Sequence, residues 1–463
     1  MNQLSVWLHF HFLFSFLDKF DKIWISEFFH NWGGYVGLIT SRLMPTNMNR
    51  EYSFIFFPSR QYVVLFAVVF ILSTWLNIMY KYTRGYTIYV DTTKCNRLEK
   101  GKEIAENPNV QILRLDDNHY TVKSQTTNRK YDVISTESGF VCTCPDHTFR
   151  KICCKHIHGV EFSLKIREQV RKEKSITIEQ IDVSICPKCK SEKIATRGIR
   201  KNKNYSIQRY FCNDCNKWFS FNIGFERSKQ NPKAITQALQ LYFTGESLRG
   251  VQRFLKLQGV EVSHQTILNW ITKYTKLMKQ YTDKIVPQVG DTWRADEVFV
   301  KVKGDLKYLF ALMDDETRFW IAQEVGHRKE GHDASSLFKL AKDVTQTKPK
   351  VMITDGLQSY KEAYKKEYWT QKNPRTVHIR HIRLQGDHNN NKMERLNGEF
   401  RDREKVRRGV KKTDSILFDG YQLYHNYIRP HMGLDNKTPS EACGITIQGN
   451  DKWKTLIERA SLG

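Results

Sequence analysis

The sequence has 463 residues, a length that predicts about three domains. Lys and Arg number 74 against 49 Asp and Glu, so the formal net charge is +25 and the expected partner is a polyanion, either nucleic acid or an anionic membrane surface. Most of the cysteines fall into two tight clusters, which excludes the disulfide framework of a small secreted protein and favours a reducing compartment.

Residues 1–84 form an apolar, aromatic-rich region with few charges. Within it, residues 62–80 carry no charge, lie between Arg60 and Lys81, and are long enough to span a bilayer. Two interpretations stay open: a membrane anchor, or an over-extended start with translation beginning at Met48 or Met79. The expected localisation is cytoplasmic and nucleoid-associated, with anchoring through residues 62–80 as the alternative.

Strands and a first metal cluster are predicted between residues 85 and 175. Residues 111–141 alternate as strands do, with turn signals at Asp116 and Thr127. The stretch ends in four residues with the composition of a closed structural zinc site: Cys142, Cys144, Cys154 and His156. By a shift of register, Cys153 could replace Cys154 and His158 could replace His156. The Cys-x-Cys and Cys-x-His pattern after a hairpin resembles a SWIM-type zinc finger, a module associated with DNA or protein binding.

A second metal cluster is predicted within residues 180–228. Two Cys-x-x-Cys pairs indicate a four-cysteine zinc ribbon, with the ligands Cys186, Cys189, Cys212 and Cys215. The segment between the pairs is basic and contains aromatic residues, which suits phosphate contact and base stacking, although a solvated charged loop explains it about as well. The candidate DNA-binding residues of this segment are Arg197, Arg200, Lys201 and Lys203.

Residues 230–285 are predicted to form helices. A short helix, a turn containing Gly259 and a helix that begins at Ser263 have the order of a helix-turn-helix, with Ser263 as the N-cap. The second helix would enter the major groove of DNA by its first turns. The side chains it would present are His264, Gln265, Asn269 and Lys273.

Three carboxylates stand out within residues 290–445, which are predicted to form an α/β catalytic domain. Asp296 lies early in a strand where Val298, Val300 and Val302 alternate with exposed residues, and Asp355 ends the short apolar run 350–354. Glu394 lies on a helix that follows a run of asparagines. Further strands are predicted at 306–313, 319–325 and 376–383 and a helix at 332–345, and residues 446–463 are left as a tail.

Such a trio of carboxylates can hold hard divalent ions. Mg²⁺ prefers oxygen ligands and keeps much of its water, so two or three carboxylates with substrate phosphates suffice. Two ions about 3.5–4 Å apart could serve an in-line phosphoryl displacement. Mg²⁺ or Mn²⁺ is therefore the expected cofactor at these residues, beside Zn²⁺ at the two structural sites.

The order and flanks of these motifs resemble DDE transposases of the insertion-sequence-six type and their archaeal relatives. The resemblance rests on Trp-Arg-x-Asp-Glu, Ile-Thr-Asp-Gly and Asn-x-x-Glu-Arg in this order. It implies a ribonuclease-H-like, integrase-like core with Asp296, Asp355 and Glu394 as the metal-binding triad, and it implies that Arg401 contacts the DNA backbone. The interval between Asp355 and Glu394 is slightly longer than is usual in that family, so Glu399 stays an alternative, as does Asp387.

The whole chain is thus predicted to be a multidomain α+β protein: a SWIM-type zinc finger, a zinc ribbon, a helix-turn-helix and a ribonuclease-H-like core. Arg407 and Arg408, in the basic segment after Glu394, are further candidates for contact with the DNA backbone. The resemblance implies a transposase that cuts the ends of an insertion element and joins the 3′ hydroxyl ends to target DNA. Its expected partners are double-stranded DNA and further copies of itself. The alternative is a transposase-derived DNA-binding regulator that no longer cuts.

Overall fold

The computed structural model describes residues 92–462 except 108–111, 203–204, 227, 327–330, 372–373, 382–390, 408–409, 411 and 413–414. The predicted apolar segment 62–80 lies outside these residues, as do the candidates Lys203, Asp387 and Arg408. Among the helices of the described ranges, none combines the length and the apolar character that a membrane crossing requires.

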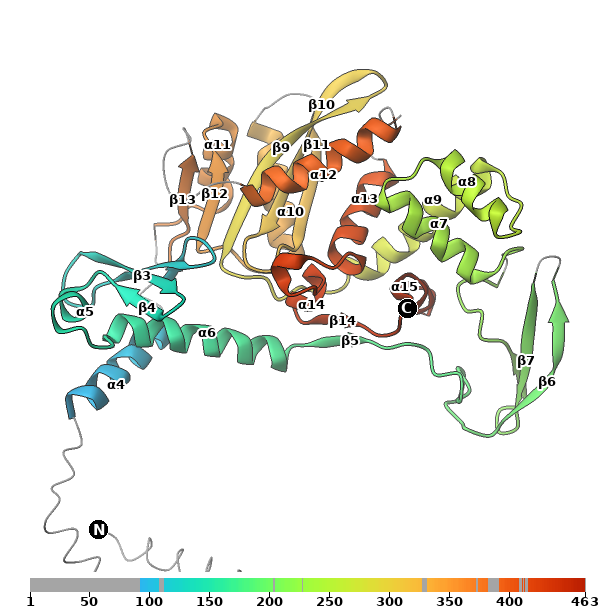
Figure 1. The fold of residues 1–463 in the computed structure, drawn as a ribbon, viewed down its shortest axis with the longest axis horizontal. Coiled ribbons are helices and arrows are strands. Elements are labelled where there is room, and N and C mark those ends of the chain that lie inside the picture. Colours follow the sequence, from blue (N-terminus) through green and yellow to red (C-terminus); the bar gives the residue numbers. More distant parts are fainter. Residues whose placement is uncertain are drawn as a thin grey trace, which may run out of the picture. The chain divides into compact units, whose positions relative to one another are not determined.

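The first described domain, residues 92–173, contains a four-stranded antiparallel sheet and is called here the four-stranded domain (Figure 1). Its elements are α4 (Thr92–Glu106), β1 (Ile112–Arg114), β2 (His119–Lys123), β3 (Lys130–Thr136), β4 (Gly139–Cys142), α5 (Pro145–Arg150) and α6 (Lys155–Glu173). Helices α4 and α6 approach closely because Gly101 and Gly159 lie at their crossing, where a Cβ on Gly159 would meet Ile104 Cγ2 at 2.9 Å. The domain has its own apolar core, which includes Val122, Val133 and Val160.

A three-stranded antiparallel sheet follows, built from β6 (Ile194–Lys201), β7 (Ser206–Cys212) and β8 (Lys217–Phe219). Before it, β5 (Ile176–Ile178) pairs in parallel with β14 (Ile445–Ile447) near the end of the chain. Residues 446–463, left as a tail by the sequence, therefore begin in a strand. They continue into α15 (Lys452–Ala460), whose Trp453 and Leu456 are buried in the main core.

Three helices follow this sheet in the sequence and precede the predicted catalytic domain: α7 (Pro232–Thr244), α8 (Leu248–Leu257) and α9 (His264–Thr282). The Ser263 side chain accepts a hydrogen bond from the Thr266 N–H and caps α9, as predicted. The turn before α9 contains Gly259 at φ 74°, a backbone conformation that favours glycine. Ile235, Val251 and Ile271 join these helices to the core of the catalytic domain.

The catalytic domain is organised around a five-stranded mixed sheet in the order β11-β10-β9-β12-β13. Its strands are β9 (Thr292–Val302), β10 (Asp305–Asp314), β11 (Trp320–Gly326), β12 (Val351–Asp355) and β13 (Val377–His381). The first three strands pair antiparallel, and β12 and β13 join parallel to β9. This is the strand arrangement of the predicted ribonuclease-H-like core, and the strands lie where the sequence pattern placed them.

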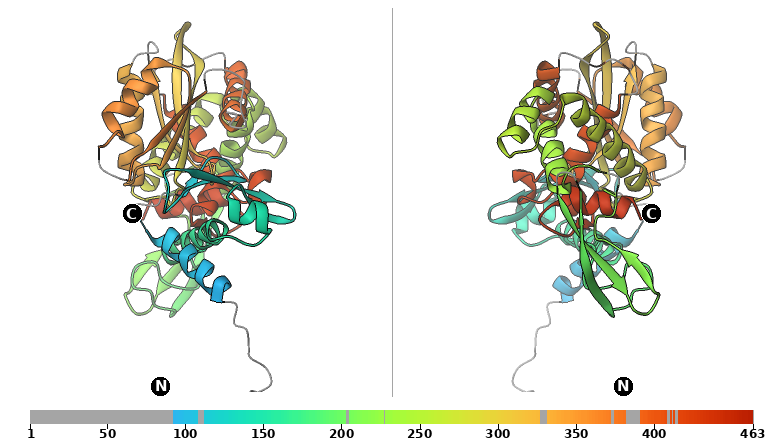
Figure 2. Two further views of the ribbon diagram at one scale, coloured as in Figure 1. Left: turned by 90° about the vertical axis from the view of Figure 1, so that its left-hand side faces the viewer. Right: turned by 90° about the vertical axis from the view of Figure 1, so that its right-hand side faces the viewer.

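Helices cover both faces of this sheet (Figures 1 and 2). α10 (Gly331–Thr345) and α11 (Gln358–Glu367) pack together on one face, and α12 (Asn391–Arg407) crosses β9 on the other. After α12 come α13 (Ile416–Leu423), a π-helical turn (Tyr424–Ile428), a 3-10 turn (Met432–Leu434) and α14 (Pro439–Ala442). The face of the sheet between β9, β12 and α12 is thereby the place where the predicted acids can meet.

Candidate functional site

Asp296 and Asp355 lie side by side because their strands are neighbours. In the parallel pair of β9 and β12, Val351 is opposite Thr292 and Ile353 is opposite Arg294. The same register, continued by two residues, places Asp355 opposite Asp296. Carboxylate oxygens of Asp296, Glu297 and Asp355 come within 4.8 Å of one another, a spacing that can hold a metal ion.

Helix α12 brings Asn397 into contact with Asp296 and places Glu394 nearby, outside the group whose oxygens lie within 4.8 Å of one another. Asn397 Nδ2 donates a hydrogen bond of 2.9 Å to Asp296 Oδ2, which fixes the helix against β9. Glu394 lies one turn earlier on the same face of α12 and is exposed. Its negative charge is close enough to contribute to the raised pKa of Asp296. Arg401, two turns after Glu394, is also exposed on this helix.

The alternative third acid, Glu399, has a different partner. Arg429 Nη2 lies 2.7 Å from Glu399 Oε1, and the second guanidinium nitrogen contacts the other carboxylate oxygen. This two-point ion pair ties α12 to the segment after α13 and neutralises the carboxylate. Glu394 is thus the acid of α12 that faces Asp296, and the other alternative, Asp387, lies outside the described residues.

Glu297 is a member of the acidic group that sequence reasoning missed. Tyr360 on α11 donates a hydrogen bond of 3.1 Å to Glu297 Oε2. Burial and the negative charge of Glu297 raise the pKa of Tyr360, so its hydroxyl stays protonated and available as a donor. The only signal in the sequence was the adjacency of two acids, and alternation along a strand would have turned them to opposite faces.

The electrostatics of this acidic group favour a cation. Burial, and then the negative charges of Glu297, Asp355 and Glu394, raise the pKa of Asp296 to about 7. Three or four carboxylates on a partly buried surface repel one another, and a divalent cation would remove that repulsion. The donors are all carboxylate oxygens, the ligand type that Mg²⁺ and Mn²⁺ prefer. The residues present therefore fit the expected metal.

This raised pKa predicts how stability depends on pH when no Mg²⁺ is present. A raised carboxyl pKa stabilises the folded state below the ordinary pKa of Asp, and the contribution is lost as pH rises through about 7. Without Mg²⁺, the melting temperature of Asp296→Asn relative to wild type should therefore be higher at pH 8 than at pH 5, by roughly 2 °C. Thermal unfolding of the zinc-loaded chain measures this, and an equal difference at both pH values would contradict it.

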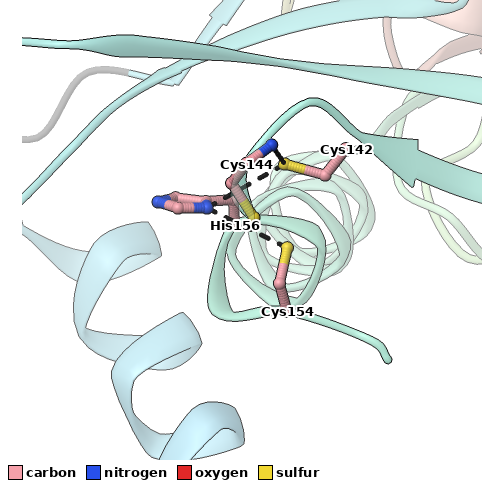
Figure 3. A group of neighbouring side chains, drawn as sticks. All are labelled: Cys142, Cys144, Cys154 and His156. Carbon is pink, nitrogen blue, oxygen red and sulfur yellow. Dashed lines mark hydrogen bonds between the residues drawn. The ribbon is translucent and has the colours of Figure 1, made fainter. Parts of the chain in front are cut away.

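The first cysteine cluster lies where β4 meets α5 and α6 (Figure 3). Cys142 ends β4, Cys144 and Cys154 precede α5 and α6, and His156 lies in the first turn of α6. All four are buried, and their ligand atoms lie within 4.8 Å of one another. The sulfurs of Cys142 and Cys154 are each 3.9 Å from His156 Nδ1, close to the edge of a tetrahedral zinc site.

The structure decides between these four residues and the alternative ligands that the sequence left open, Cys153 and His158. Cys153 is exposed, and its sulfur lies 3.7 Å from His158 Nδ1. His158 Nδ1 also lies 3.1 Å from Glu161 Oε2. Neither Cys153 nor His158 belongs to the buried group, so Cys154 and His156 are the members that fit a tetrahedral metal.

The second cluster joins the two loops of the three-stranded sheet. Sulfur to sulfur distances are 3.8 Å between Cys186 and Cys215 and 3.5 Å between Cys189 and Cys212, and all four sulfurs lie within 4.8 Å. Lys190 (φ 63°) and Asn216 (φ 52°) each follow a Cys-x-x-Cys pair in the left-handed conformation. This backbone turns each loop around a common centre, and four thiols at that centre fit structural zinc.

The predicted DNA-binding residues that the structure describes lie on the surface. Arg197, Arg200 and Lys201 are exposed along β6. The α9 candidates His264, Gln265, Asn269 and Lys273 are exposed as well. The aromatic Tyr210 of the same hairpin as β6 is half-buried and packs against Phe219 and Phe221. Of Arg407 only the backbone is described.

A five-stranded mixed sheet in this strand order, with clustered acids on two neighbouring strands, defines a ribonuclease-H-like core. Comparison with known families agrees, because residues 290–431 match the family model of the DDE domain of IS240-type transposases. The chain thus carries a domain that is similar to the DDE domain of transposases.

Curated relatives extend this similarity to two groups of organisms. The transposase for insertion sequence-like element IS431mec of Staphylococcus aureus is 31% identical over 150 residues, which cover 31% of this chain and 64% of the relative. The insertion element ISM1 uncharacterized 48.3 kDa protein of Methanobrevibacter smithii is 26% identical over 190 residues, covering 38% of this chain and 46% of the relative. The chain thus spans less than two thirds of the length of these relatives.

Solved structures with similarity to the chain include the catalytic core domain of HTLV-2 integrase in complex with magnesium. It is 16% identical, with 34% of this chain and 98% of that chain covered and a TM-score of 0.26. The simian T-cell lymphotropic virus intasome in complex with PP2A regulatory subunit B56 gamma is also 16% identical, with 44% and 70% covered and a TM-score of 0.26.

Proposed function

We propose that this protein is a transposase that cuts the ends of an insertion element and joins them to target DNA. The observation that carries the proposal is the acidic group of Asp296, Glu297 and Asp355 on neighbouring strands, with the charge of Glu394 close to it on the crossing helix. In the first step, water attacks the phosphodiester at the end of the element and frees a 3′ hydroxyl. In the second step, that hydroxyl attacks a phosphodiester of target DNA and displaces the adjoining 3′ oxygen.

The residues of the site have distinct tasks in this reaction. Asp296, Asp355 and Glu394 would hold Mg²⁺ or Mn²⁺, which when bound supplies activation of the attacking oxygen and stabilisation of the leaving oxygen. Asn397 holds Asp296 in place through its 2.9 Å hydrogen bond. Arg401 lies on the same helix face, where its positive charge suits a DNA phosphate beside the acids.

Recognition of the element ends is assigned to the parts of the chain before the catalytic domain. The exposed side chains at the start of α9 suit base contacts in the major groove, with α8 and the Gly259 turn as the first half of a helix-turn-helix. The basic face of β6 suits phosphate contact. Zn²⁺ at the two cysteine clusters would fold a SWIM-type finger and a zinc ribbon that hold these surfaces in shape.

The reaction joins two element ends to one target, so the acting form is expected to be an oligomer on double-stranded DNA, in the cytoplasm and at the nucleoid. An anchor through residues 62–80 stays the alternative for localisation. The acidic group disfavours the regulator alternative. Acids without a bound cation repel DNA phosphates and weaken DNA binding, so a protein that only binds DNA gains no advantage from them.

The proposal is tested with purified chain and a DNA fragment that ends in the inverted repeats flanking the gene. With Mg²⁺ or Mn²⁺ we expect a nick at the repeat end that leaves a 3′ hydroxyl, followed by joined products when a second DNA is present. Both products are resolved on a denaturing gel with labelled strands. Tight binding to the repeats without any cleavage in either metal would favour the regulator instead.

A further inference from the structure

A buried ion cluster lies next to the acidic group and is centred on Asp315, in the turn between β10 and β11. Asp315 is 0% exposed, and its Oδ1 atom is 2.5 Å from Arg294 Nε and 3.0 Å from Lys392 Nζ. In the sequence Asp315 lies between two predicted strands, where a turn acid is usually exposed, whereas the structure places it in the interior. Arg294 precedes Asp296 by two residues in β9, and Lys392 precedes Glu394 by two residues in α12. One carboxylate thus joins the two elements that carry these catalytic acids.

The ammonium group of Lys392 has three oxygen partners. They are Asp315 Oδ1 at 3.0 Å, the Asp315 carbonyl oxygen at 3.0 Å and Asp117 Oδ1 at 2.8 Å. Because an ammonium group has three N–H donors, this set uses all of them. The first turn of α12 is therefore held at Lys392, one turn before Asn397 holds Asp296.

The third partner, Asp117, belongs to the four-stranded domain, and the same domain contributes Arg114 to the cluster. Arg114, at the end of β1, lies 2.8 Å from Asp117 Oδ1 and 3.7 Å from Asp315 Oδ2. The carbonyl oxygen of Arg114 accepts a hydrogen bond from Thr292 Oγ1 in β9. The cluster is therefore assembled from both domains.

The same short strand also touches the element that carries the remaining acid. Leu113, next to Arg114 in β1, packs against Val351 and Ile353 of β12, the strand that ends at Asp355. The four-stranded domain thus contacts β9, β12 and α12. These are the three elements that carry Asp296, Asp355 and Glu394.

Burial makes this arrangement stiff. The side chains of Arg294, Asp315 and Arg114 are exposed by 3%, 0% and 8%. Removing one partner of such a buried group leaves a charge without compensation, so the partners stay together. Burying charged side chains between two domains costs desolvation energy, and a hydrophobic contact could hold the domains together equally well. What the ion cluster adds is a fixed geometry next to the acids.

We propose that Asp315 and Lys392 are positioning residues that set the placement of Asp296 and Glu394, and that the four-stranded domain completes this placement through Arg114 and Asp117. The inference rests on the proposed function, since it assigns the acidic group to metal binding. It makes the cysteine-bearing domain a working part of the catalytic site. Carboxylates must stay within about 0.5 Å of the productive geometry, so loss of their support weakens metal binding.

The test measures Mn²⁺ affinity of the zinc-loaded full chain by electron paramagnetic resonance of the free ion. Lys392→Met is expected to weaken Mn²⁺ binding by about tenfold, as loss of a supporting partner does at other metal sites. Electrostatics alone predict the opposite sign, because removal of a positive charge beside the acids would tighten binding. Lys392→Arg keeps the charge and the donors and should retain most of the affinity.

Two further variants separate positioning from general stability. Asp117→Asn, at a half-exposed side chain, should weaken Mn²⁺ binding by a few fold with an unchanged unfolding midpoint. The matched control is Lys342→Met, which breaks a 2.8 Å ion pair with Glu367 between α10 and α11 and should leave Mn²⁺ affinity unchanged. Unchanged or tighter binding in Lys392→Met, or equal weakening in Lys342→Met, would overturn the inference.

This measurement does not depend on DNA cleavage. If wild-type chain binds Mn²⁺ and Lys392→Met binds it more weakly, the positioning role stands even where the chain cuts no DNA, and only the proposed transposase reaction is then lost. If wild-type chain cuts DNA while Lys392→Met binds Mn²⁺ and cuts as well as wild type, the positioning role is lost and the proposed function stands.

Discussion

Alanine at Asp296, Asp355 or Glu394 is expected to lower the rate of strand cleavage by roughly a thousandfold or more, with binding to terminal-repeat DNA nearly intact. The reason is that metal ions supply several kcal/mol of transition-state stabilisation, and each 1.4 kcal/mol is a factor of ten in rate. Binding is expected to persist because most of the exposed DNA-binding candidates lie on α9 and β6, elements that carry none of the three acids. Cleavage and binding are measured on the same labelled repeat fragment.

Glu399→Ala is the matched control, since it removes the other carboxylate of α12. Its partner is Arg429, so we expect a lower unfolding midpoint with cleavage reduced far less than in Glu394→Ala. An inactive Glu399→Ala beside an active Glu394→Ala would show that the third acid is wrongly assigned. Joint loss of DNA binding and cleavage in the triad variants would indicate a structural role for these acids.

Local patterns were enough to predict most of the catalytic domain. Alternation placed Val298, Val300 and Val302 on the buried face of β9, and the structure has them buried with Phe299 outside. An apolar run that stops at an acid predicted that Asp355 would end a strand. Capping at Ser263 and helical spacing after the asparagines predicted the starts of α9 and α12. These signals are local because hydrogen bonding and burial within one element decide them.

The cluster around Asp315 could not be predicted in this way. Asp315 has the surroundings of a turn acid in the sequence, and nothing within a few residues shows that Arg294, Lys392 and Arg114 meet it from three distant segments. Whether a charged residue is buried depends on partners that the fold supplies. For the same reason the choice between Glu394 and Glu399 needed Arg429, which lies 30 residues after Glu399 in the sequence.

The cysteine clusters give the second large expected effect: the purified chain should contain two zinc ions. Binding of structural zinc contributes on the order of 10 kcal/mol in small cysteine-rich modules, so folding of each module depends on its metal. Cys154→Ser and Cys212→Ser should each lower the content to one zinc per chain, because both thiols lie in the buried centres of their clusters. Metal content is measured by inductively coupled plasma mass spectrometry, and folding by circular dichroism with and without chelator.

Cys153→Ser is the matched control for the first cluster, because Cys153 adjoins Cys154 but is exposed and lies beside His158. It should keep two zinc ions and the wild-type unfolding midpoint. Loss of zinc in Cys153→Ser with retention in Cys154→Ser would show that the register of the site is shifted by one residue. A wild-type chain with a single zinc ion would remove one of the two sites, and the cysteine variant that leaves the zinc content unchanged would show which site is absent.

Because the four-stranded domain reaches β9, β12 and α12 through Leu113, Arg114 and Asp117, loss of its zinc should also weaken Mn²⁺ binding at the acids.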